Sequence, residues 1–68
     1  MENVVIKVGG MSCQGCVKNV TAVLMALSGV QSAEVSLEVG EARVVFDAAQ
    51  ITLPALKAAI EDAGFDAA

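Results

Sequence analysis

The apolar residues of this 68-residue chain change their spacing along the sequence, and this change constrains the fold more than any other feature. Near the N-terminus, apolar side chains occupy every second position at Val4, Ile6 and Val8. This alternation predicts a half-buried strand over residues 2–8, which a pair of glycines ends. The spacing then changes to steps of three and four, which predicts an amphipathic helix from about residue 14 to residue 27. The apolar stripe of this helix consists of Val17, Val20, Leu24 and Leu27.

The middle of the chain returns to a spacing of two. Residues 30–38 place Ala33, Val35 and Leu37 on one face of a second strand and polar side chains on the other. A turn at Gly40 leads into a further alternating segment that ends at Phe46. Two such segments joined by a short turn predict an antiparallel hairpin.

A second helix is predicted from the residues that follow the hairpin. Thr52 can cap its N-terminus, and Pro54 is compatible with its first turn, where the missing amide would be unpaired in any case. Gly64 is placed to end the helix, so residues 65–68 can form only a short closing strand. The apolar stripe of the second helix consists of Leu53, Leu56, Ile60 and Ala63.

The order strand, helix, strand, strand, helix, strand predicts an α+β fold. This order is that of the ferredoxin-like βαββαβ sandwich, in which two helices cover one face of a four-stranded antiparallel sheet. A chain of 68 residues suffices for one domain with a modest core and is too short for two. We therefore expect residues 1–68 to form a single domain with a single binding site.

The composition argues against several classes of function. A formal charge of −4 and an aromatic content limited to two Phe disfavour phosphate and base contacts, so no nucleic-acid partner is expected. The longest apolar stretch, 22–27, is far shorter than the roughly 20 residues of a membrane span, so no membrane insertion is expected. Glu2 replaces the basic start of a secretory signal, which indicates a cytoplasmic location.

Reactive side chains gather only around Cys13 and Cys16, at the predicted start of the first helix. The chain has no His, which excludes catalytic triads, imidazole bases and zinc sites that contain His, and we do not expect an enzyme. A disulfide between residues three positions apart closes too small a loop to stabilise a fold. In a reducing compartment, such a pair indicates metal binding or redox activity.

The position of the two thiols favours a soft metal ion. The N-terminal end of a helix stabilises thiolates, and Lys18 adds some positive potential. Two thiolates without further donors suit a soft d¹⁰ ion of low coordination number, whereas zinc usually requires four ligands. Copper(I) is therefore favoured over zinc. A Cys-x-x-Cys pair alone can also be redox-active or incidental, and Gly9 and Gly10 can simply end the strand. The position of the pair agrees with the whole fold pattern, and this agreement argues for a metal site.

The segment GMSCQGC at residues 10–16 resembles the GMxCxxC motif of heavy-metal-associated domains. These domains occur in bacterial copper chaperones and at the N-termini of copper-transporting P-type ATPases. The resemblance extends over essentially the whole chain and includes the Gly-Phe pair at residues 64–65.

The resemblance implies that Cys13 and Cys16 bind one copper(I) ion per chain, with Hg(II), Ag(I) or Zn(II) as substitutes. It also implies that Met11 anchors the loop without being a ligand, with Gly10 and Ser12 as further loop support. A thioether fills irregular gaps well, which agrees with a packing role for Met11.

Two other residues are assigned roles by the resemblance. Phe65 matches a position beside the metal loop where chaperones often carry Tyr or Lys; it could shield the sulfurs from water, or it could be an ordinary core aromatic. Lys18 could help docking, although a solvated helix residue is the commoner role for such a lysine. Four acidic residues are expected to lie on solvated faces: Glu34, Glu38, Glu61 and Asp62.

The implied function is copper(I) carriage to a copper-transporting P-type ATPase, by a protein that is monomeric without metal and able to form a copper-linked dimer. One alternative is the N-terminal metal-binding domain of such an ATPase, or a mercury-binding relative; the start at Met1 favours a free chaperone. A thiol-disulfide oxidoreductase is the alternative from another class. Thioredoxin-like motifs surround their cysteines with Trp and Pro, whereas the single proline here, Pro54, opens a helix.

Overall fold

The computed structural model describes residues 1–67 and contains the six predicted elements in the predicted order. Residue 68, the last of the predicted closing strand, lies outside the described residues. The elements are β1 (Glu2–Gly9), α1 (Gln14–Met25), β2 (Val30–Ser36), β3 (Glu41–Phe46), α2 (Leu53–Asp62) and β4 (Asp66–Ala67).

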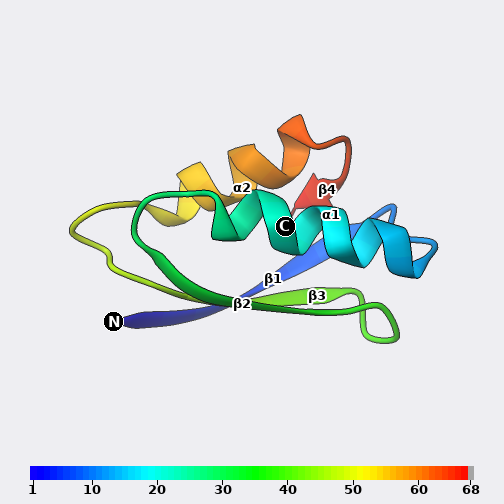
Figure 1. Cartoon of the computed structure of the whole chain (residues 1–68), viewed down its shortest axis with the longest axis horizontal. Helices are drawn as coiled ribbons and strands as arrows, with labels where there is room; N and C mark the ends of the chain where they lie inside the picture. Colours follow the sequence, from blue (N-terminus) through cyan, green and yellow to red (C-terminus); the bar gives the residue numbers. More distant parts are fainter. Residues whose placement is uncertain (68) are drawn as a thin grey trace.

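The strands form one sheet in the order β2-β3-β1-β4, and every neighbouring pair is antiparallel. Strand β1 lies against β3 with Glu2 opposite Phe46 and Lys7 opposite Glu41. Both helices cover the same face of the sheet (Figure 1). The predicted ferredoxin-like fold is thus confirmed. Neither helix in residues 1–67 has both the length and the apolar character needed to cross a bilayer.

The core lies between this face of the sheet and the helices. Alternate residues of β1 and β3 meet the apolar stripes of the two helices, as the two spacings in the sequence require. Full burial of one such aliphatic side chain contributes about 1.5–3 kcal/mol. The buried residues are Ile6, Val8, Val20, Leu24, Ala42, Val44, Phe46, Leu56 and Ile60.

Three predicted details differ in the structure. Helix α1 ends at Met25, and Leu27 lies in the following turn while still packing against the core. Strand β2 ends at Ser36, so Leu37 belongs to the hairpin turn. Helix α2 ends at Asp62, which leaves Ala63 exposed and outside the apolar stripe. Each difference lies at an element end, where local spacing is a weak guide to the boundary.

The connection from α1 to β2 depends on a glycine. Gly29 has φ of +95°, and its carbonyl accepts a 2.7 Å hydrogen bond from the Asp47 amide. A Cβ at this position would lie 2.8 Å from the Cβ of Gln50 and 3.1 Å from the Cγ2 of Ile51. Gly29 therefore provides both an unusual backbone angle and a close approach between two connecting segments.

We expect Gly29→Ala to lower the free energy of unfolding by roughly 2–4 kcal/mol, since it combines backbone strain with a steric clash. Gly64→Ala is the matched control, because Gly64 has φ of +97° and no atom within 4 Å of the added Cβ. Backbone strain alone should cost about 1 kcal/mol there. Urea unfolding measures both values, and equal losses in the two variants would contradict the steric part of the argument.

Candidate metal centre

Both cysteines lie where the loop after β1 enters α1. Cys13 is the N-cap residue of α1, with an extended backbone at φ −156° and ψ 168°. Its carbonyl accepts hydrogen bonds from the amides of Cys16 at 3.1 Å and Val17 at 3.3 Å. These bonds close the first turn of the helix over Cys13. The fold therefore brings a cap residue and a first-turn residue to the same end of α1.

The two sulfur atoms are neighbours. The Sγ atoms of Cys13 and Cys16 lie 3.2 Å apart, and both residues are free thiols. This separation is well beyond the 2.05 Å of a disulfide bond, so it is a contact between two thiol groups. Cys13 is exposed and Cys16 is half-buried. A ligand that approaches from solvent thus meets both sulfurs, with Cys13 the more accessible.

Hydrogen bonds at the helix start lower the pKa of the Cys16 thiol. The main cause is a hydrogen bond with the backbone of Ser12, followed by one with the side chain of Cys13. These bonds favour the thiolate and outweigh the desolvation that acts in the opposite direction. The thiolate is the form in which a cysteine binds soft metal ions, so these hydrogen bonds favour the form of Cys16 that metal binding requires.

The residues predicted to support the loop are found next to it. Met11 is half-buried and packs against the core, and Phe65 does the same from the segment between α2 and β4. The ring edge of Phe65 lies 3.8 Å from the point that a Cβ on Gly10 would occupy. Gly10 itself has φ of +90°, a backbone conformation that favours glycine. Ser12 is exposed in the loop and contributes through its backbone.

Two charged residues near the loop complete this description. Lys18 is exposed on α1, and no ion pair of Lys18 occurs within residues 1–67. Asp66 was not singled out in the sequence. It pairs with Gly9 in the sheet, and a Cβ on Gly9 would lie 3.3 Å from the Cβ of Asp66 and 3.5 Å from its Oδ2. Only the pairing of β4 with β1 could have placed this carboxylate beside the loop.

The donor set of the site is small. Within the described part of the chain, no cluster of three or more His, Cys, Asp or Glu side chains could hold a metal ion. The two thiols thus have no additional ligand of these types beside them. Two sulfur donors with open space around them suit a soft ion of low coordination number, and they do not supply the four ligands of a structural zinc site.

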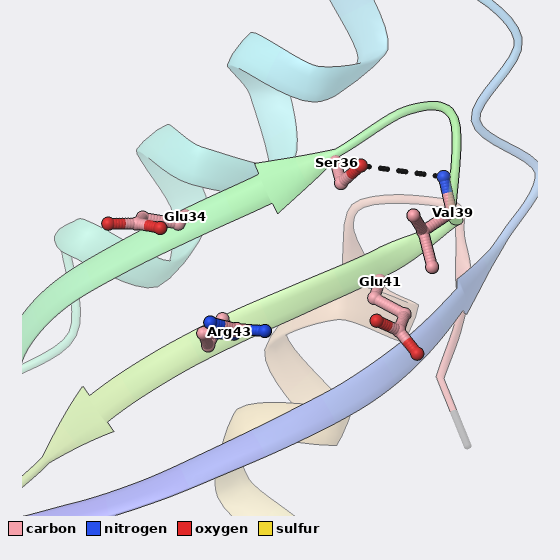
Figure 2. A pocket seen from close by; sticks show the side chains of 5 residues that line it. All are labelled: Glu34, Ser36, Val39, Glu41 and Arg43. Carbon is pink, nitrogen blue, oxygen red and sulfur yellow. Dashed lines mark hydrogen bonds between the residues drawn. The ribbon is translucent and has the colours of Figure 1, made fainter.

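A pocket lies elsewhere, on the hairpin of β2 and β3. It has a volume of about 300 Å³, and Arg43 lies in it between Glu34 and Glu41, with Ser36 and Val39 near the turn (Figure 2). No residue of the cysteine loop lines this pocket. The thiol pair therefore lies outside this pocket.

The fold and the thiol pair together define a small α+β domain with two neighbouring free thiols at the start of its first helix. A family model described as the heavy-metal-associated domain matches residues 5–66. The chain belongs to the heavy-metal-associated domain family.

Similar proteins agree with this assignment. The copper chaperone CopZ of Staphylococcus saprophyticus is 47% identical over 66 residues, which cover 97% of each chain. A copper-binding domain from HMA7, a P-type ATPase, has a TM-score of 0.99 and 41% identity over all of this chain and 92% of that one. A structure named CopZ metallochaperone has a TM-score of 0.95 and 37% identity over 98% of this chain and all of that one.

Proposed function

We propose that this chain is a copper(I) metallochaperone. It binds one copper(I) between Cys13 and Cys16, carries it in the cytoplasm and transfers it to a copper-transporting P-type ATPase. The observation that carries this proposal is the pair of free thiols 3.2 Å apart at the start of α1. Full-length similarity to proteins named copper chaperone CopZ supports the choice of copper.

Transfer proceeds by exchange of thiolate ligands. A two-coordinate copper(I) has room for a third sulfur, so a cysteine thiolate of the receiving protein can bind before a donor thiolate leaves. Cys13 is the more exposed ligand and leaves first. One copper–sulfur bond forms and one breaks, the copper remains copper(I), and the released thiolate takes a proton from water. Cys16 leaves in a second exchange of the same kind.

The surrounding residues hold the loop ready for this exchange. Met11 anchors the loop to the core, and Gly10 and Ser12 allow the chain to turn toward α1. Phe65 packs beside Gly10 and shields that side of the loop from water, but it has neither the hydroxyl nor the charge to interact with the sulfurs. Lys18 is a docking contact on the first turns of α1.

A metal-binding domain of a P-type ATPase is the second candidate. The structural match to the HMA7 domain supports it, since this match is as extensive as those to the chaperones. A thiol-disulfide oxidoreductase has less support. Pro54 lies in the first turn of α2, at the opposite end of the molecule from the cysteine loop (Figure 1).

A competition titration with copper(I), zinc(II), silver(I) and mercury(II), read by native mass spectrometry, tests the proposal. We expect one copper(I) per chain, retained against a moderate chelator and against excess zinc(II), because two thiolates satisfy copper(I) and leave zinc under-coordinated. Silver(I) and mercury(II) should compete for the same site. The apo protein should be a monomer, and any dimer should require copper. Failure to retain copper(I), or its displacement by zinc(II), would refute the proposed function.

A further inference from the structure

We propose that Gly15 is a specificity-determining residue for metal exchange, because its missing side chain leaves one side of the Cys13 sulfur open to a thiol carried by another folded protein. Gly15 is the second residue of α1 and lies between the two cysteines in the chain. The inference rests on the proposed function, since it concerns how a receiving cysteine reaches the same site. Gly15 acts through Cys13 and is not itself a ligand.

The Cys13 sulfur is the neighbour that a side chain at position 15 would meet. A Cβ on Gly15 would lie 3.7 Å from the Cys13 Sγ, which is an ordinary van der Waals contact. Apart from the adjacent residues and the helix backbone, no other atom of residues 1–67 lies within 4 Å of that point. Both Gly15 and Cys13 are exposed. A methyl group at position 15 would therefore contact the sulfur and cover part of its exposed surface.

The usual structural reasons for a glycine do not apply at position 15. Gly15 lies in an α-helix and does not have a positive φ. It also has no close approach like that at Gly29, where a Cβ would lie 2.8 Å from another side chain. Glycine is a weaker helix former than alanine, so the helix itself gains nothing from it. The backbone thus tolerates a side chain here, and the effect of having none falls on the Cys13 sulfur.

An open side matters most for a thiol that belongs to a folded protein. Cys13 is the more exposed of the two ligands and leaves first in the proposed exchange. A small thiol can turn freely and reach a partly covered site from another side. A cysteine fixed on a protein surface has few productive orientations, so a methyl group in its path lowers the rate of productive encounters. Gly15 therefore speeds exchange with protein thiols, while small thiols gain little from it.

Two substitutions at position 15 test this role. Gly15→Ala adds one methyl group beside the sulfur, and Gly15→Val adds a larger side chain at the same point. Asn19→Ala is the matched control, because Asn19 is exposed one turn further along α1 and its truncation adds no atom. Both alanine substitutions favour the helix, so the control separates steric cover from a firmer helix. Circular dichroism and urea unfolding verify that each variant keeps the fold.

The first measurement uses the reduced protein without metal. Iodoacetamide and an iodoacetamide attached to a long polyethylene glycol chain react by the same step, in which the thiolate sulfur bonds to the methylene carbon and iodide leaves. Fragmentation of the tryptic peptide 8–18 in a mass spectrometer shows how much label is on Cys13. A change in the thiol pKa alters both rates alike, so the ratio of the two rates reports steric access.

We expect the large reagent to label Cys13 about threefold more slowly in Gly15→Ala and about tenfold more slowly in Gly15→Val, while iodoacetamide slows by less than about twofold. Asn19→Ala should match the wild-type protein with both reagents. Equal slowing with both reagents would overturn the inference, as would an unchanged rate with the large reagent in both position-15 variants.

The second measurement follows copper(I) from each loaded, unlabelled variant to one of two acceptors. The large acceptor is ¹⁵N-labelled apo wild-type protein, the small one is the dithiol dithiothreitol, and native mass spectrometry records the transfer. We expect transfer from Gly15→Val to the protein acceptor to slow by at least about threefold, and transfer to dithiothreitol by less than about twofold. Losses of the same size with both acceptors would contradict a role in selecting protein thiols.

The two measurements separate this inference from the proposed function. Absence of copper uptake by the wild-type protein would refute the proposed function, and labelling of the apo protein would still decide whether Gly15 keeps the Cys13 sulfur open. Uptake of one copper(I) by every variant, with unchanged labelling and transfer rates, would refute only the role of Gly15.

Discussion

Replacing either Cys13 or Cys16 with alanine is expected to lower the affinity of the chain for copper(I) by more than about 100-fold. Loss of a group that merely orients a metal ligand already costs about 10-fold to 100-fold, and here one of two ligands is removed. No His, Asp, Glu or further Cys side chain within residues 1–67 joins the two thiols in a possible metal cluster. Competition with a chelator of known copper(I) affinity measures the loss.

The control for this experiment is Ser32→Ala, at an exposed position on β2. It should bind copper(I) like the wild-type protein. Neither cysteine belongs to the buried core, so both alanine variants should keep the far-ultraviolet circular dichroism of the parent. Wild-type affinity in both cysteine variants would show that copper binds elsewhere and would contradict the assignment of the site.

The largest expected change in stability comes from the buried core. Leu24 of α1 is fully buried, and its replacement by alanine should lower the free energy of unfolding by about 2–5 kcal/mol. Small domains of this size have roughly 3–10 kcal/mol in total, at about 0.05–0.15 kcal/mol per residue. Leu24→Ala should therefore leave a measurable unfolded fraction at physiological temperature. Urea unfolding of the apo protein measures the change.

The neighbouring residue provides the comparison. Met25 is 46% exposed, and Met25→Ala should change stability by less than about 0.5 kcal/mol. Copper(I) should restore part of the stability of Leu24→Ala, since a ligand at 100 times its dissociation constant stabilises the folded state by about 2.7 kcal/mol. Similar losses in the two variants would show that α1 does not pack in the manner described here.

Different parts of the fold hold the cysteine loop and expose its thiols. The buried faces of α1 and β1 hold the ends of the cysteine loop in place, so the loop does not need a large core of its own. Both thiols remain at the surface, where a partner can reach them. The residues that stabilise the fold are thus separate from the two thiols.

Local spacing was sufficient to predict the type and order of the elements. The alternation at Val4, Ile6 and Val8 and the helical spacing at Val20 and Leu24 correspond to β1 and α1 in the structure. The sequence also predicted that the two cysteines lie at the start of α1. These predictions succeed because strand and helix spacing reflect which side of a single segment is buried, and each segment carries that information itself.

Element ends were predicted less accurately. The predicted ends of α1, β2 and α2 lie one or two residues beyond the observed ends. Turn geometry, as at Gly29, competes with the apolar pattern at these positions. Strand β4 contains only residues 66–67 within the described chain. This length agrees with the short closing strand predicted for residues 65–68.

The amino-acid sequence alone determined the six elements, their order and the two sulfurs that the chain offers to a metal. Only the tertiary structure decided that these sulfurs lie 3.2 Å apart, that Phe65 packs beside Gly10, and that Asp66 lies next to the loop. The physical reason is that such contacts join residues far apart in sequence, and they depend on strand pairing and on the packing of helices across the sheet.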